Sequence, residues 1–167
     1  PETLARDGST RASVGLTAGS FGTWESRLGV SYSGESLATS VNVNDYSSDN
    51  YRFNNRVEQR NVDGEIRALH STGHLAFKFG LDNQSLRLPG ERTAAQLLSD
   101  PRGTSRPGDY SSKDGHRGSL EGLFDLGFAE LAVDLAYRDS TRTAWLRDYA
   151  GGAFNSYVDS RVRVWSF

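Results

Sequence analysis

The segment HLAFKFGLDNQSLRL, residues 74–88, alternates between apolar and polar side chains. Its odd-numbered side chains from Leu75 to Leu81 are apolar, whereas the even-numbered ones include Lys78 and Asp82. Because successive side chains of a β-strand point to opposite faces of the sheet, the pattern predicts a strand with one apolar and one polar face. The fold class depends on what each of these faces contacts.

The same period-two alternation recurs along the chain and predicts further strands. Together with the first segment, the predicted strands cover residues 12–19, 24–33, 37–45, 62–69, 74–88, 119–127, 129–139 and 157–167. In the last of them, Val158, Val162 and Val164 alternate with charged residues and are expected to form the apolar face. The chain therefore predicts an all-β fold of about eight strands.

The connections between these strands alternate in length. Short connections occur at residues 34–36, 72–73 and 127–128, and they predict tight hairpin turns. Longer or more polar connections separate the other strands, at about residues 20–23, 47–61, 87–115 and 141–155. This order is typical of an up-and-down antiparallel meander that has short turns at one end of its strands and longer loops at the other, as in outer-membrane barrels.

The composition excludes several classes of protein. Only 36% of the residues are apolar, and no segment approaches the roughly 20 apolar residues of a membrane-spanning helix. The net charge of -2 gives no basic excess, so no nucleic-acid partner is expected. The absence of cysteine removes disulfides and thiolate metal sites. Strands that cross a bilayer escape the hydropathy test because their alternation averages to a polar value.

Two features favour a membrane barrel over a soluble β-sandwich or a soluble barrel. The predicted strands approach the length of about 9–11 residues that a tilted strand needs to cross a bilayer. Aromatic residues gather near strand ends, as in an interfacial belt; the candidates for the membrane interface are Phe21, Trp24, Tyr32 and Tyr137. We therefore expect an antiparallel up-and-down transmembrane β-barrel in the bacterial outer membrane, with Leu75, Phe77, Phe79 and Leu81 facing lipid and Lys78 and Asp82 facing the lumen.

Three segments resemble parts of TonB-dependent outer-membrane receptors. RASVGLTAGSFGTWESRLGVSYSG (11–34) is similar to their first barrel hairpin, LPGERTAAQLLSDPRGTSRPGDYSS (88–112) to a long extracellular loop, and SLEGLFDLGFAELAVDLAYRDS (119–140) to the following periplasmic hairpin. The resemblance implies that residues 1–10 are a linker from a missing plug domain. It also implies that residues 11–167 are the first strands of a larger barrel of about 22 strands.

The resemblance further implies a transport function. The intact protein would take up a scarce ligand, such as an iron–siderophore chelate or a small cofactor, and TonB would act only through the missing plug. The sequence leaves open a self-contained eight-stranded outer-membrane barrel with a structural or binding role.

No catalytic constellation accompanies this pattern, so no enzyme activity and no bound cofactor are expected. His70, His74 and His116 lack the spacing of metal ligands, because a predicted turn separates the first two. No G-x-S-x-G elbow and no phosphate-binding loop is present.

The long loop at residues 88–112 is the best candidate for ligand binding, because it exceeds the usual length of an unstructured connection. Guanidinium groups suit carboxylate or phosphate ligands, and tyrosine suits aromatic or catecholate ligands. The candidate residues are Arg92, Arg102, Arg106 and Tyr110 on this loop, with Tyr51, Trp145 and Tyr149 on neighbouring ones. TAAQLL, residues 93–98, is expected to form one or two helical turns before Pro101. The alternative is a solvated loop with incidental arginines.

Overall fold

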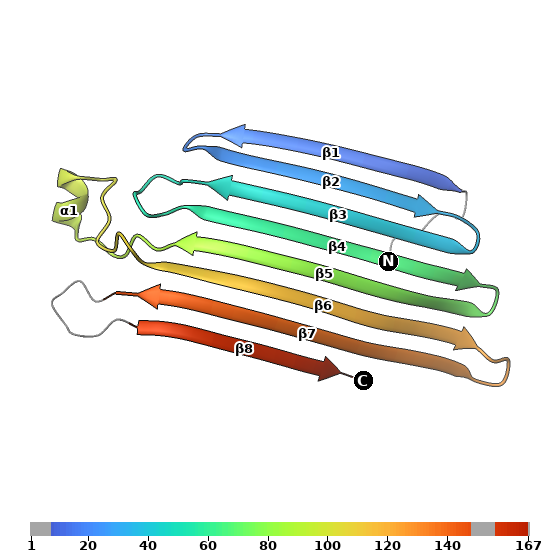
Figure 1. The fold of residues 1–167 in the computed structure, drawn as a ribbon. Coiled ribbons are helices and arrows are strands. Elements are labelled where there is room, and N and C mark those ends of the chain that lie inside the picture. Colours follow the sequence, from blue (N-terminus) through green and yellow to red (C-terminus); the bar gives the residue numbers. More distant parts are fainter. Residues whose placement is uncertain (1–7, 148–155, 167) are drawn as a thin grey trace.

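The computed structural model describes residues 8–147 and 156–166, which form one antiparallel sheet and one short helix (Figure 1). The elements are β1 (Ser9–Gly19), β2 (Thr23–Ser33), β3 (Leu37–Ser48), β4 (Val57–His70), β5 (Gly73–Arg87), α1 (Ala94–Ser99), β6 (Tyr110–Asp125), β7 (Glu130–Leu146) and β8 (Ser156–Ser166). Within these ranges, no helix has the length and apolar character needed to span a membrane.

The sheet is a simple meander in which each strand pairs with its neighbours in chain order, from β1 to β8. The predicted all-β antiparallel architecture of eight strands is therefore confirmed. Within the described residues the sheet is open, and β1 and β8 form its two edges. Among these residues the strands do not close into the eight-stranded barrel that the sequence left open.

Several strands extend further toward the longer loops than the sequence predicted. β4 begins at Val57, β6 begins at Tyr110 and β7 continues to Leu146. These extensions carry polar cross-strand pairs, such as the ion pair between Arg60 and Asp45, in place of apolar alternation. Hydrophobic periodicity misses such segments because backbone pairing continues where the apolar pattern has ended.

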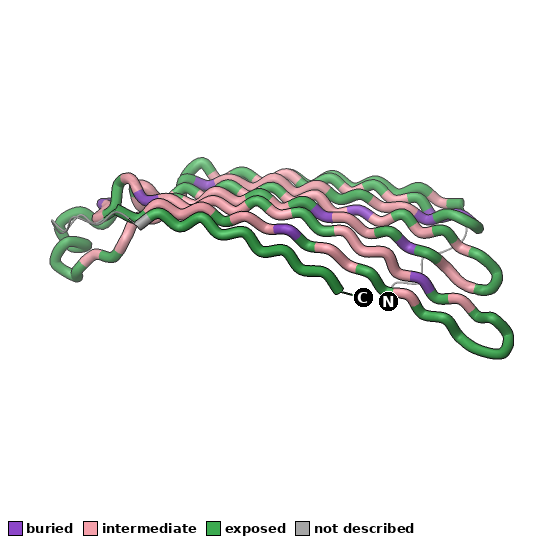
Figure 2. The backbone as a smooth tube through the Cα atoms, turned by 60° about the horizontal axis from the view of Figure 1, so that its bottom comes forward, coloured by how far each residue is buried: buried purple, intermediate pink, exposed green. Residues whose placement is uncertain are grey.

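The sheet is a single layer that twists and curves, with few buried residues (Figure 2). Ala38 and Ala76 are the buried apolar residues among those described. A sandwich would bury its apolar face against a second sheet, but many large apolar side chains remain exposed on this single layer. The molecule therefore has an apolar surface in place of a central core.

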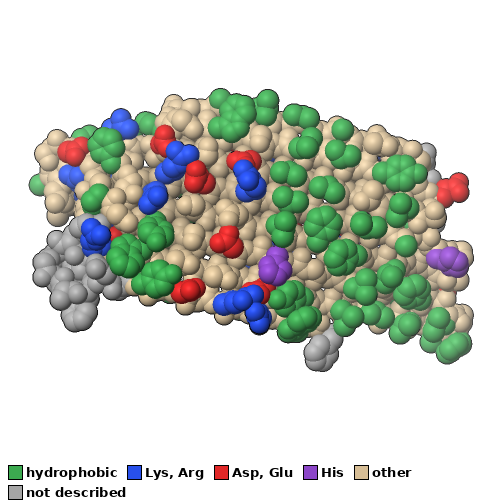
Figure 3. Space-filling model, viewed as in Figure 1, with side chains coloured by type: hydrophobic (Ala, Val, Ile, Leu, Met, Phe, Trp, Pro, Cys, Tyr) green, Lys and Arg blue, Asp and Glu red, His purple; other side chains and the backbone are tan. Residues whose placement is uncertain are grey.

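The pairing register places most of these apolar side chains on one face, because directly paired residues of antiparallel strands point to the same side. One row of partners runs through Tyr32, Thr39, Ile66, Phe77, Leu120 and Leu135. We call the exposed apolar side chains of this face the apolar band: Val14, Leu16, Leu28, Val30, Val41, Ile66, Leu75, Phe77, Leu81, Leu131 and Leu135. Figure 3 shows apolar side chains over the half of this face near the short turns and charged ones over the half near the loops.

The apolar band is inclined to the rows of paired residues. One row contains Val14, Leu28, Val43, Val62, Leu81, His116 and Asp139, and it changes from apolar at β1 to charged at β7. The apolar side chains thus shift toward the short turns from one edge of the sheet to the other. Strands that cross a planar apolar layer at a tilt show this stagger.

The prediction for the face of the last strand is wrong. Val162 pairs with Ser140 and Val164 with Arg138, so these valines lie on the polar face. Trp165 instead pairs with Tyr137, and their ring centroids are 4.3 Å apart. Each of the two faces of β8 carries bulky apolar side chains. The register of β8 against β7 decides which of these side chains join the apolar face of the sheet.

A substitution at Gly73, where β5 begins, tests how tightly the turn between β4 and β5 packs against β6. A Cβ atom on Gly73 would lie 2.0 Å from the carbonyl oxygen of Leu123 on β6. We expect Gly73→Ala to lower the free energy of unfolding by about 1–3 kcal/mol, because backbone must move to admit the methyl group. The urea midpoint, followed by far-ultraviolet circular dichroism, measures this change.

Gly15→Ala is the matched control, since the nearest atom to its added Cβ would be the Cβ of Arg27 at 3.7 Å. This variant should unfold within about 0.5 kcal/mol of the parent. Equal midpoints for the two variants would show that the Gly73 contact is not restrictive.

Candidate functional site

The polar face carries ion pairs that join neighbouring strands. Lys78 on β5 pairs with Glu121 on β6 at 2.6 Å, and Lys113 on β6 pairs with Asp82 on β5 at 2.6 Å. Lys78 and Asp82 lie on the face opposite to Phe77 and Leu81, as the alternation predicted. The sheet therefore separates one mainly apolar surface from one that is charged and internally paired.

Glycines make room for these charged side chains. Gly80 pairs with Arg117, and a Cβ on Gly80 would lie 2.6 Å from the guanidinium carbon. Gly115 pairs with Asp82, and its Cβ would lie 2.5 Å from a carboxylate oxygen. Each glycine thus lets a long or charged partner lie flat against the sheet, where it reaches an ion partner on another strand.

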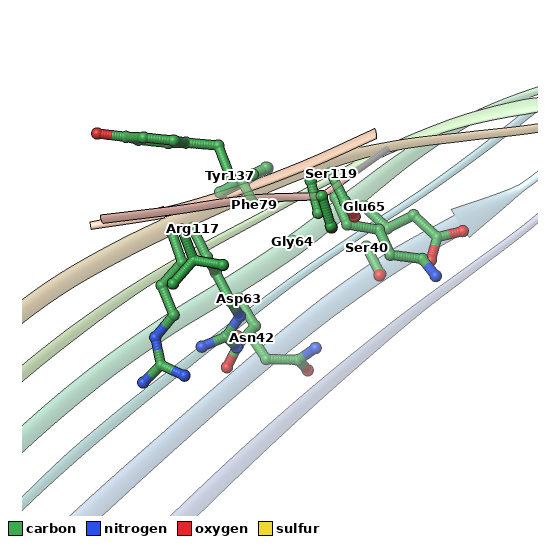
Figure 4. Close-up of a pocket in the computed structure, with 15 residues that line it drawn as sticks. Ser40, Asn42, Asp63, Gly64, Glu65, Phe79, Arg117, Ser119 and Tyr137 are labelled. Atoms are coloured by element: carbon green, nitrogen blue, oxygen red, sulfur yellow. Dashed lines mark hydrogen bonds and ion pairs between the residues drawn. The ribbon is translucent and has the colours of Figure 1, made fainter. Parts of the chain in front are cut away.

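A hollow of about 460 Å³ opens on the polar face. Its charged lining residues are Asp63, Glu65, Lys78, Arg117 and Arg138, and serine and asparagine side chains from β3 and β6 complete much of its wall. Figure 4 shows Asn42, Asp63 and Arg117 pointing to one side of the sheet and Tyr137 to the other. Arg117 forms an ion pair with Asp63 across two strand boundaries, so the hollow is lined by charges of both signs.

This lining suits water or a polar solute. Throughout residues 8–147 and 156–166, no group of three or more His, Asp or Glu side chains is arranged to hold a metal ion.

At the end of the strands opposite the short turns, residues 49–56 connect β3 to β4. This connection forms hydrogen bonds with the longer connection of residues 88–109, between β5 and β6. Arg52 donates hydrogen bonds to the carbonyl oxygens of Gly103 at 3.1 Å and Gly90 at 2.9 Å. The amide of Asn54 donates to the carbonyl oxygens of Arg106 at 2.6 Å and Leu88 at 3.1 Å. The two connections therefore form one assembly, which we call the loop assembly.

The helical prediction within this assembly is confirmed. α1 begins after Thr93, whose side chain accepts a hydrogen bond from the backbone of Gln96, and the Gln96 side chain accepts one from the backbone of Thr93. This capping box satisfies backbone donors that the start of a helix leaves unpaired. The helix ends at Ser99, before Pro101.

The three predicted loop arginines contact the protein itself. Arg92 donates to the carbonyl oxygen of Gln96 and pairs with Asp100 at 3.5 Å. Arg102 lies over the rings of Tyr51 and Phe53, at 5.9 and 5.1 Å from their centroids.

Arg106 donates to the carbonyl oxygen of Arg147 at 2.7 Å. These contacts stabilise the loops and make the arginines part of the loop framework; ligand binding by them stays a prediction.

Two of the predicted aromatic loop residues, Tyr110 and Trp145, lie on strands and not on loops. Tyr110 begins β6 and receives the guanidinium of Arg87 over its ring at 5.5 Å. Trp145 pairs with Tyr110 and packs near Tyr157 of β8, with ring centroids 6.1 Å apart. Tyr51 lies near Arg102 in the loop assembly, and Tyr149 lies outside the described residues.

Sequence reasoning missed Asp109, which is fully buried at the end of the long connection. Its carboxylate accepts a hydrogen bond from the backbone N–H of Arg147 at 2.9 Å and lies 3.5 Å from the guanidinium of Arg106. This side chain connects the loop assembly to the end of β7. No motif marks it, because its partner is a backbone group far away in sequence.

The predicted interface aromatics lie at different heights on the sheet. Trp24 and Tyr32 occupy the loop end and the short-turn end of β2 and are 45% and 38% exposed. Phe21 lies in the turn between β1 and β2, edge-on to Tyr51 with ring centroids 5.6 Å apart. Tyr137 lies at the border between the apolar band and the charged part of its face. Membrane contact by these side chains stays a prediction.

Beyond that border, Asp139 forms the centre of a charged cluster. It is 2% exposed and accepts hydrogen bonds from Arg161, Arg163 and the hydroxyl of Tyr137. The Nε of Arg161 lies 2.9 and 3.0 Å from the two carboxylate oxygens of Asp139. The cluster therefore holds one carboxylate between two guanidinium groups.

No family model matches this chain, and no curated protein or solved structure matches it either. The function must therefore be argued from the two faces of the sheet and from the loop assembly.

Removal of the Arg52 side chain tests the loop assembly. We expect Arg52→Ala to speed tryptic cleavage within residues 88–109 by roughly tenfold, because it removes charge-assisted hydrogen bonds to the carbonyl oxygens of Gly90 and Gly103. The cleavage rate is measured by mass spectrometry of the released peptides.

Arg56→Ala is the control on the same connection, since Arg56 forms exposed ion pairs with Asp49 and Glu58. Exposed pairs contribute little to stability, so this variant should be cleaved at nearly the parent rate. Equal rates for the two variants would contradict the role given to Arg52.

Proposed function

We propose that this sheet is part of the wall of an outer-membrane β-barrel of the TonB-dependent receptor type. The intact protein would take up a scarce ligand such as an iron–siderophore chelate or a small cofactor. The observation that carries the proposal is the inclined apolar band on one face of a sheet whose other face is charged and paired. The resemblance of the first hairpin and of the long loop supports the choice of family.

The apolar band supports contact with lipid. Burying a Leu, Val or Phe side chain away from water contributes about 1.5–3 kcal/mol, so a surface of many such side chains strongly favours an apolar environment. Monomeric soluble proteins rarely expose apolar patches larger than a few hundred square ångströms. The segment from Trp24 to Tyr32 has about the length that a tilted strand needs to cross a bilayer.

The polar face supports an aqueous or protein-filled lumen. Several charged side chains of this face pair with one another, as Lys78 does with Glu121 and Lys113 with Asp82, which lowers the number of isolated charges that a lumen would have to hydrate. The edges of β1 and β8 also favour a larger barrel, because backbone N–H and C=O groups must be paired inside lipid. Additional strands would supply those partners.

The loop assembly supports a receptor. It lies at the rim opposite the short turns, which in outer-membrane barrels face the periplasm, so it would face the cell exterior. Its internal hydrogen bonds hold a long connection in a defined shape, which limits the entropy lost when a ligand binds. Tyrosine and arginine side chains in this assembly suit catecholate and carboxylate groups. TonB would act through a plug domain.

A charge placed in the apolar band tests the membrane contact. We expect Val14→Arg in the intact protein to reduce its amount in the urea-washed outer-membrane fraction, because arginine at the bilayer midplane costs about 2–4 kcal/mol. Thr17→Arg, on the opposite face of β1, should leave that amount nearly unchanged. A soluble β-protein would show no difference between these variants and would appear in the soluble fraction.

The mass of the native polypeptide tests the receptor assignment. An antibody against residues 88–112 should detect a band in the outer-membrane fraction several times larger than 18.3 kDa. A receptor with a plug and about 22 strands requires that size. A band near 18 kDa in the same fraction would instead support a small self-contained barrel.

A further inference from the structure

Two arginines of β8 share one carboxylate of β7. Arg161 donates its Nε to Asp139 at 2.9 Å, and Arg163 donates its Nε at 3.1 Å. The carboxylate side chain is 3% exposed, whereas the two arginine side chains are 54% and 55% exposed. One carboxylate cannot neutralise two guanidinium groups, so this cluster presents net positive charge to its surroundings.

The cluster also presents unused hydrogen-bond donors. A guanidinium has five N–H donors in a planar fork. Among the described residues, Arg163 contacts Asp139 through Nε, and no partner is found for its two terminal nitrogens. The buried carboxylate fixes the position of the fork, so little side-chain entropy remains to be lost when an acceptor binds.

The cluster lies directly beside the apolar band and on the same face. Asp139 pairs with Arg163, and the next pair on this face toward the short turns is Tyr137 with Trp165. The ring of Tyr137 also lies 5.8 Å from that of His116. Figure 3 shows charged side chains and a histidine adjoining the apolar side chains.

There is space beside the cluster for a polar group. A hollow of about 380 Å³ is lined by Arg60, His116, Asp139 and Arg161, among others. Arg60 is already paired with Asp45 on this face, so it adds no net charge of its own. Of the two β8 arginines only Arg161 lines this hollow, and Asp114 adds a carboxylate to its wall, so the net positive charge belongs to the cluster around Asp139 and not to the hollow as a whole.

We propose that Arg161 and Arg163 bind the phosphate of a membrane lipid headgroup. This proposal rests on the proposed function, which places the apolar band in lipid. Arginine matches phosphate with parallel N–H···O hydrogen bonds, and aromatic rings such as Tyr137 and Trp165 favour the level of the headgroups. The acyl chains of the bound lipid would lie along the apolar band, which a phosphate solute could not use.

Lipid retention by the purified intact protein tests this site. The protein is extracted from its outer membrane in a neutral detergent, supplied with phosphatidic acid or phosphatidylcholine, and examined by native mass spectrometry. We expect the parent to retain phosphatidic acid preferentially and Arg163→Gln to reduce this retention about tenfold, the loss expected for a charge-assisted hydrogen bond. This variant should fold, since Arg161 still pairs with Asp139.

Arg138→Gln is the matched control. It removes the same charge from β7, but Arg138 lines the hollow of the opposite face. Its retention of phosphatidic acid should equal that of the parent, and Arg163→Lys should fall between the parent and Arg163→Gln because it keeps the charge and loses the fork.

Three results would overturn the lipid site: no preference of the parent for phosphatidic acid, equal retention by Arg163→Gln and the parent, or full displacement of the lipid by inorganic phosphate. The last result would assign the arginines to a free phosphate. All three leave the membrane proposal intact, whereas failure to find the protein in the outer-membrane fraction would refute the membrane proposal itself.

Discussion

The register of antiparallel pairing is the constraint on which the rest of this structure depends. A slip of one residue would move every side chain of a strand to the other face, so Phe77 would exchange places with Lys78. Charges on the polar face oppose such a slip, because Lys78 and Lys113 each meet a carboxylate on the adjacent strand. Gly80 and Gly115 add a steric condition, since each lies beneath a charged side chain. The polar face thereby fixes the position of the apolar band.

Much of the sheet could be predicted because alternation is a local property. Eight strands and three short turns follow from period-two patterns and from glycine-containing connections, without knowledge of any long-range contact. The face of β8 could not be obtained in this way. Val158, Val162 and Val164 suggest one parity, but Tyr137 and Asp139 on β7 supply partners for Trp165, Arg161 and Arg163 on the other. When either face of a strand could be the apolar one, pairing with the neighbouring strand decides which face joins the apolar side of the sheet.

The loop assembly was less predictable for a different physical reason. The sequence identifies guanidinium and tyrosine groups, but it does not identify their acceptors. Arg52 and Asn54 bind carbonyl oxygens, which every residue carries, so neither contact leaves a sequence pattern. Asp109 likewise binds a backbone N–H of Arg147. By contrast, α1 was predictable, since the capping box of Thr93 and Gln96 is encoded within a few residues.

The inclination of the apolar band links the ion pairs of the sheet to its proposed environment. Leu28 on β2 and Asp139 on β7 belong to the same row of paired residues, but only Leu28 lies within the band. If the strands crossed an apolar layer without tilt, that row would have one environment along its whole length. Tilt instead allows a row to begin in the apolar layer and to end beyond it. In the proposed membrane, Asp139 would therefore hold two arginines beside the level of the headgroups, and its row partners on β1 and β2 would contact acyl chains.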